Sequence, residues 1–187
     1  MTLLNALRTE TSEVHTALHL HPIMLACQEK RITLSEYHHM LRAFQAPWLM
    51  LSSCISEFPI QNLKAFLKTR ADTLNNDIEQ LETETAPNTT KTTHLSSSQD
   101  SLLGIAYVLV GSSMGASLLR KCLHAALPDA PMRYMSMTAQ ESGWPLLATE
   151  LGELETHTFP GACKAASDTF AFVNQQLDLP VNPIGIA

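Results

Sequence analysis

The side chains best suited to chemistry near the start of the chain are three histidines within seven residues, at positions 15, 19 and 21. His15 and His19 are four residues apart, so on a helix their imidazoles lie on one face and could chelate a metal ion. No E-x-x-H or second carboxylate-bearing motif accompanies them. Spacing alone therefore leaves two interpretations open, a metal-ligating pair and buried histidines held by hydrogen bonds.

Arg8 precedes His15 by seven residues. On a helix, two turns separate these positions, which places both side chains on nearly the same side, about 10 Å apart along the axis. That separation suits a ligand that is held by a metal at its centre and by an acidic group at its edge. Heme has this form, because it combines an iron atom with two propionates.

Three of the seven glycines lie in one apolar segment, residues 102–119. Gly104, Gly111 and Gly115 are spaced by seven and four residues, so a helix aligns them on one face. Each glycine inside a helix costs about 1 kcal/mol relative to alanine. A stripe of this kind indicates that the helix backbone lies close to a partner, either another helix or a flat ligand.

Composition and charge exclude several classes of protein. The 187 residues are 45% hydrophobic and 16% charged, which is typical of one globular, helix-rich domain. The formal net charge is −6 and no basic block is longer than two residues, so nucleic-acid binding is not expected. The four cysteines form no C-x-x-C pair and no secretory signal precedes them, which predicts reduced thiols in the cytoplasm.

The segment 102–119 carries no formal charge over 18 residues, which just reaches the length of a transmembrane helix. It contains Gly, Ser and Tyr, however, and it ends abruptly at Arg120. We therefore expect a helix that is buried on all sides within a bundle, and no membrane partner.

Helical periodicity recurs along the whole chain, and no alternating strand pattern is present. The sequence predicts an all-α fold with one domain over residues 1–179 and an irregular tail at 180–187. Thr33 and Glu36 predict a capping box at the start of one helix. The first expected helices are residues 3–18, with Pro22 as the stop, residues 34–48, and a helix that Pro59 opens and that runs to residue 81. A loop at 83–100 precedes the glycine-bearing helix. The last expected helices are residues 132–140, one that begins near residue 144, and residues 160–177.

Two segments in combination resemble the bacterial heme oxygenase family. The stretch from Leu7 to His15 reads L-R-x-x-T-x-x-x-H, which resembles the family segment that carries the proximal histidine. The stretch from Gly104 to Ala116 resembles the distal-helix pattern G-x-x-Y-V-x-x-G-S-x-x-G. The similarity extends from about residue 3 to residue 178 and implies a single-domain, multi-helix bundle of the heme oxygenase type. Further agreement lies in Ile32 to Tyr37, in Arg70-x-x-x-Leu74-x-x-Asp77-x-x-x-Leu81 and in Ser142-Gly143-Trp144.

The resemblance implies that His15 is the proximal ligand of the heme iron, bound through a neutral imidazole nitrogen. Arg8 takes the position of a basic residue that pairs with a propionate. Tyr107 is a candidate hydroxyl donor to the same edge of the heme.

The same resemblance implies that Gly111, Ser112 and Gly115 form the distal wall and carry the catalytic role there. Without a Cβ, the backbone can approach bound dioxygen closely, and this crowding directs oxygen toward a meso carbon of the porphyrin. Two departures from the family are Ala116, where many members have glycine, and His19, where a small or acidic residue is usual.

The activity implied is oxidative cleavage of heme at a meso carbon to biliverdin, ferrous iron and carbon monoxide, with heme as both substrate and cofactor and O2 as oxidant. Because the chain has no flavin or iron–sulfur motif, an external electron donor is implied, either a ferredoxin, a flavodoxin or a reductase. Two alternatives stay open: a heme carrier or sensor without turnover, and a thiaminase-like helical enzyme acting on another small molecule. The latter would use a cysteine or carboxylates, and the sequence offers no well-placed set of them.

Overall fold

The structure is a computed structural model that describes residues 1–82 and 98–183. Over these ranges the regular structure is helical, and the only β contact is an isolated bridge between Thr2 and Glu155, so the all-α prediction is confirmed. The helices are α1 (Leu3–Glu10), α2 (Ser12–His19), α3 (Pro22–Gln28), α4 (Leu34–Ser53), α5 (Lys64–Glu82), α6 (Gln99–Ala126), α7 (Arg133–Ser136), α8 (Ala139–Ser142), α9 (Trp144–Glu153) and α10 (Ala162–Leu177), with short 3-10 turns at Ile55–Glu57, Gln61–Leu63 and Thr156–Thr158.

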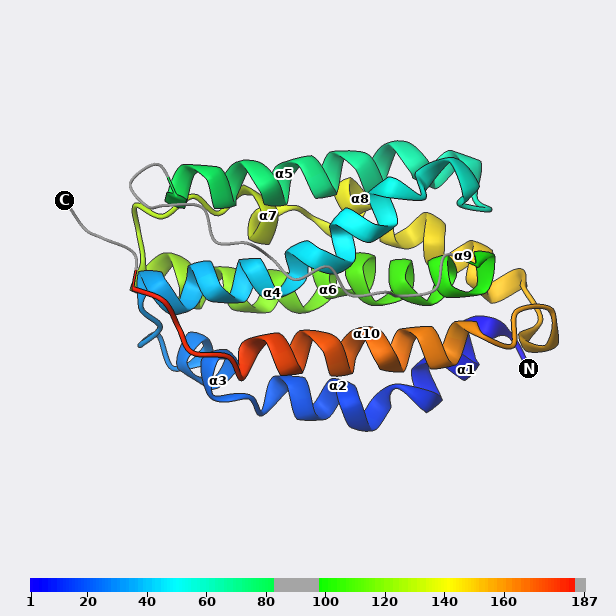
Figure 1. Ribbon diagram of the computed structural model, residues 1–187, viewed down its shortest axis with the longest axis horizontal. Coiled ribbons are helices and arrows are strands. Elements are labelled where there is room, and N and C mark those ends of the chain that lie inside the picture. The colour runs from blue at the N-terminus through cyan, green and yellow to red at the C-terminus, as the bar shows by residue number, and fades with distance from the viewer. Residues whose placement is uncertain (83–97, 184–187) are drawn as a thin grey trace.

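The helices form layers around α6 (Figure 1). Helix α5 lies along one long side of the molecule, α4 and α6 run through the middle, and α10 lies between them and α1 and α2 on the other side. Helix α6 contacts α10, α4, α7 and α3. By length and composition α6 could cross a membrane, but 61% of its apolar window is buried inside the fold. The uncharged segment is therefore a core helix, as its Gly and Ser content suggested.

The first predicted helix, residues 3–18, is wrong in one respect, because the structure divides it at Thr11 into α1 and α2. The buried Thr11 hydroxyl donates to the carbonyl oxygen of Leu7 at 2.7 Å. A threonine that bonds back to the preceding turn bends a helix, and Thr11 has φ −100° and ψ 0°. The backbone bonds from Thr11 to Leu7 and from His15 to Thr11 are kept, so the axis turns without a gap.

Two prolines also act differently from the prediction. Pro22 was expected to end the first helix, but it occupies the first turn of α3, where a missing N–H costs nothing. His21 caps that helix, since its Nδ1 accepts the backbone N–H of Ile23 at 3.2 Å. Pro59 was expected to open the third helix, but α5 begins at Lys64, after two 3-10 turns.

The capping box at Thr33 and Glu36 is confirmed. The predicted helix over 132–140 is instead two short helices, α7 and α8, because Met137 is extended and Thr138 starts a second capping box with Glu141. Most of the predicted loop at 83–100 lies outside the described residues, and α6 begins at Gln99. Of the predicted tail, residues 180–183 have no helix or strand, and 184–187 lie outside the described residues, so the tail stays a prediction.

One of the three aligned glycines serves helix packing. A Cβ on Gly104 would lie 2.2 Å from the carbonyl oxygen of Ala162 and 2.8 Å from the backbone nitrogen of Ala166, both in α10. Backbone atoms cannot yield as a flexible side chain can, so only glycine allows this approach. The close contact between α6 and α10 depends on this position.

We predict that Gly104→Ala lowers the free energy of unfolding by about 1–3 kcal/mol, because the added methyl group overpacks a rigid contact. The gain in helix propensity of about 1 kcal/mol is too small to offset it. Gly152→Ala is the matched control, since nothing lies within 4 Å of a Cβ on this α9 residue. Urea unfolding followed by circular dichroism measures both, and equal stabilities of the two variants would contradict the prediction.

Candidate functional site

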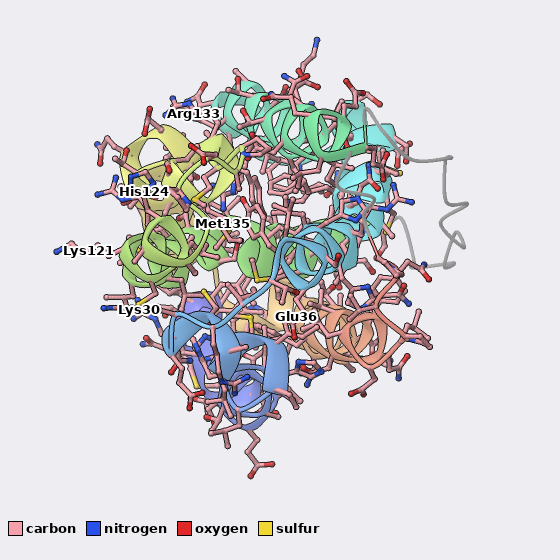
Figure 2. All side chains as sticks on the ribbon, turned by 90° about the vertical axis from the view of Figure 1, so that its left-hand side faces the viewer. Lys30, Glu36, Lys121, His124, Arg133 and Met135 are labelled. Carbon is pink, nitrogen blue, oxygen red and sulfur yellow. The ribbon has the colours of Figure 1, made fainter. Side chains whose placement is uncertain are left out.

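A cavity of about 690 Å³ lies between the N-terminal helices and α6. This volume is within the usual range for small-molecule and cofactor sites. Its lining is mostly apolar and comes from α1, α2, α3, α4, α6, α7, α9 and α10. In an end-on view Met135, which lines the cavity, lies among the helices, whereas Lys121 and His124 lie at the surface (Figure 2). All six residues predicted as site residues line this cavity: Arg8, His15, Tyr107, Gly111, Ser112 and Gly115.

His15 and His19 contribute their imidazoles from one face of α2, as the four-residue spacing predicts. Their Nε2 atoms are 3.1 Å apart, and their rings are nearly perpendicular, with centroids 4.5 Å apart. The ring of Phe170 in α10 packs edge-on against His15, at 5.5 Å between centroids. The pair therefore forms a contact of two imidazoles in the wall of an apolar cavity.

Burial lowers the pKa of His15 below its ordinary value, and the positive charge that His19 can carry lowers it further. Both causes penalise the protonated ring, so the neutral imidazole is favoured at neutral pH. The neutral ring is the form that binds a metal ion or accepts a hydrogen bond.

Gly111 and Gly115 present bare backbone to the cavity from α6. A Cβ on Gly111 would lie 3.2 Å from the ring of Trp144, and one on Gly115 would lie 3.9 Å from Cε1 of His19. The two glycines thus face an aromatic ring of α9 and an imidazole of α2. Gly111 thus allows the ring of Trp144 to pack on α6, and Gly115 leaves room for the ring of His19, whereas Gly104 on the same stripe packs against α10.

Ser112, next to Gly111 in the chain, contacts both the cavity and the buried guanidinium of Arg70. Its hydroxyl donates to the carbonyl oxygen of Leu109 at 2.7 Å and accepts from Nη2 of Arg70 at 3.3 Å. Arg70 is 0% exposed, and its guanidinium lies over the ring of Tyr134, 4.3 Å from the centroid. Among the described residues, its Nε and Nη1 have no hydrogen-bond partner and no carboxylate pairs with it. The positive charge of Arg70 is therefore buried directly behind Ser112 in the cavity wall.

Arg70 and Asp77 belong to a segment that resembles the family, but the sequence assigned neither of them a role in the site. Both occur where the apolar face of α5 predicts hydrophobic residues, in the series 67, 70, 74, 77 and 81. Charged residues at such positions are a signal of buried polar contacts. Asp77 accepts the backbone N–H of Tyr134 at 2.7 Å, so the loop that begins α7 is anchored on the same face of α5.

Arg8 and Tyr107 complete the predicted set. Arg8 reaches the cavity from α1, on the far side of the bend at Thr11 from His15. Among the residues described along the cavity, Arg8 is the one lysine or arginine. The ring of Tyr107 is half-buried and lies 6.0 Å from that of Trp144 between centroids.

No family model and no curated protein sequence matches the chain. Solved structures do match it. The heme oxygenase of Leptospira interrogans has a TM-score of 0.74 at 17% identity, covering 95% of this chain and 98% of its own. Heme oxygenase-1 of the cyanobacterium Synechocystis, solved in complex with heme, has a TM-score of 0.70 at 14% identity, covering 95% of this chain and 91% of its own. The fold of this chain is therefore the all-α fold of the bacterial heme oxygenases.

We predict that His19→Gln raises the pKa of His15 part of the way toward its ordinary value. The variant removes the charge repulsion, but the larger cause, burial of the ring, stays in place. NMR titration of the imidazole resonances in wild type and variant measures the change. A His15 pKa that is unchanged, or that reaches the ordinary value in full, would contradict this ordering of causes.

We predict that Arg70→Met leaves the free energy of unfolding unchanged or raises it by about 1–4 kcal/mol. The buried guanidinium loses its hydration and recovers few hydrogen bonds, whereas methionine fills similar space without a charge. Urea unfolding measures the difference. A loss of more than about 2 kcal/mol would show that the charge is well paired in solution.

Proposed function

We propose that this protein is a heme oxygenase, which binds heme in the cavity between α2 and α6 and cleaves it at a meso carbon to biliverdin, ferrous iron and carbon monoxide. The observation that carries the proposal is one cavity lined by His15 of α2, whose pKa burial lowers, and by glycine backbone of α6, in a chain with the heme oxygenase fold. Heme, when bound, supplies both the iron centre that reacts with O2 and the macrocycle that is opened.

The N-terminal wall binds and orients the substrate. His15 offers a neutral imidazole nitrogen as the iron ligand, and the ring of Phe170 against it limits how His15 can turn. Arg8 is placed to pair with a carboxylate at the edge of the cavity, because a guanidinium holds a carboxylate with two parallel hydrogen bonds. The hydroxyl of Tyr107 is a second donor for such a group.

The α6 wall limits what can stand over the macrocycle. Gly111 and Gly115 carry no side chain on this wall. The ring of Trp144 packs on Gly111 and the ring of His19 faces Gly115, so space for a small ligand such as O2 opens beside Gly115 when His19 turns away. Ser112 is held by Leu109 and Arg70, so its hydroxyl is fixed in orientation. The lining around these residues is predominantly apolar, which suits a planar hydrophobic macrocycle.

The residues present fit heme with one restriction, which is the ring of His19. A planar macrocycle needs about 3.5 Å on each face for van der Waals contact, so its two walls must stand about 7 Å apart. The 3.9 Å between Cε1 of His19 and a Cβ position on Gly115 leaves no such gap. His19 therefore has to turn away from α6 when the macrocycle lies between the two helices.

The cavity supports the proposal over a thiaminase-like enzyme. Of the residues described along its lining, none is cysteine, aspartate or glutamate, so no thiol or carboxylate is placed there as nucleophile or base. A heme carrier or sensor would use the same His15 but would leave the bound heme intact, and turnover separates it from an oxygenase.

Three further parts of the proposal follow from this activity. The electrons come from an external donor, either a ferredoxin, a flavodoxin or a reductase. The enzyme acts in the cytoplasm, where its four cysteines, free in the structure, stay reduced. Residues 1–179 form one domain, because the buried side chains of nearly all helices join one hydrophobic cluster.

We predict that the purified protein with one equivalent of hemin shows a sharp Soret band, which decays into bilin absorption when ascorbate or a ferredoxin system is added in air. Gly115→Leu should bind hemin yet form biliverdin at least about tenfold more slowly, because its side chain fills the space beside the backbone. The matched control is Gly152→Ala, which lies outside the cavity.

Product identification by absorbance and mass spectrometry decides the outcome. Loss of the Soret band with biliverdin formed in wild type supports the proposal. A Soret band that persists under reducing conditions in air identifies a carrier or sensor, and failure to bind hemin at all overturns heme as the ligand.

A further inference from the structure

The imidazoles of His15 and His19 lie close enough to share a metal ion as well as a hydrogen bond. Their Nε2 atoms are 3.1 Å apart and both side chains line a cavity that opens to solvent. Zinc–imidazole bonds are about 2.0–2.1 Å long, so two nitrogens 3.1 Å apart can share one ion at an N–metal–N angle of about 100°. That angle lies between the square-planar and tetrahedral values that divalent transition metals adopt.

The helix backbone already holds the two side chains next to each other. The two residues are four positions apart on α2, and the helix holds their Cβ atoms at a fixed distance. Only rotation of the two rings is needed to direct both Nε2 lone pairs to a common ion. The chelate therefore requires no movement of the helix, which keeps its entropic cost low.

We propose that His15 and His19 form a two-imidazole binding site for one divalent first-row transition-metal ion. Within the described residues no group of three or more histidines, cysteines or carboxylates surrounds the pair, so water fills the other coordination positions. Nitrogen ligands without carboxylates or thiolates select Ni2+, Cu2+ and Zn2+ over Mg2+ and Ca2+. The site differs from a structural zinc centre, which uses four protein ligands.

The site also has a consequence for heme, which rests on the proposed function. The ion takes Nε2 of His15, the same atom that the proposed function assigns to the heme iron. The ion and the heme therefore exclude each other, and His19, which has no part in binding the macrocycle, gives the free protein its affinity for the ion.

The test uses the heme-free protein and Ni2+ as the probe, with a reductant to keep the cysteines as thiols. Isothermal titration compares wild type with His19→Gln and with His124→Gln, a matched exposed histidine at the end of α6 (Figure 2). Wild type and His124→Gln should bind one equivalent, and His19→Gln should bind at least about tenfold more weakly, because chelation is lost. Circular dichroism verifies that all three are folded.

Equal affinity of wild type and His19→Gln for Ni2+ would overturn the proposal. A second arm adds hemin. Ni2+ should slow hemin binding to wild type but not to His19→Gln, and an equal effect on both would overturn the exclusion. If wild type binds Ni2+ through the pair but never binds hemin, the metal site stands and the proposed function fails, so the two failures are distinguishable.

Discussion

The close approach of α6 to α10 at Gly104 holds the central helix against its main partner in the bundle. A Cβ there would meet backbone atoms of α10 at 2.2 Å and 2.8 Å, so the two helices lie as near as glycine allows. This contact fixes the path of α6 through the middle of the bundle. Two turns further on, the same stripe leaves the α10 contact and reaches the cavity at Gly111, where glycine makes room for the side chain of Trp144 rather than for a neighbouring backbone. One pattern in the sequence thus has two physical roles along one helix.

Much of the fold could be predicted because helical periodicity and capping are local properties. The capping box of Thr33 and Glu36 lies where the sequence placed it. The helix boundaries were predicted wrongly where one residue type is compatible with two local structures. A threonine such as Thr11 can sit inside a straight helix or bend it, depending on whether its hydroxyl bonds backward, and a proline such as Pro22 suits a helix start as well as a stop. Tertiary packing makes that choice, and no single window of sequence contains it.

The sequence selected residues that line one cavity, but it did not indicate which buried groups lie behind or across from them. Spacing and family resemblance selected residues from α1, α2 and α6 that all line one cavity. The buried Arg70 behind Ser112 was missed as a site component, because its role depends on where α5 packs against α6. The position of the His19 ring across from Gly115 was missed for the same reason. That ring opposes a flat ligand in the cavity as described, and it is also half of the proposed metal site.

We propose that His15 holds the iron of a heme in this cavity, and resonance Raman spectroscopy of the ferrous heme complex tests this through the iron–histidine stretching band. We expect this band in wild type and in His19→Ala, its loss in His15→Ala, and its return when imidazole is added to His15→Ala. A band that survives in His15→Ala and disappears in His19→Ala would contradict the proposal, because the iron would then be bound by the other histidine of the pair.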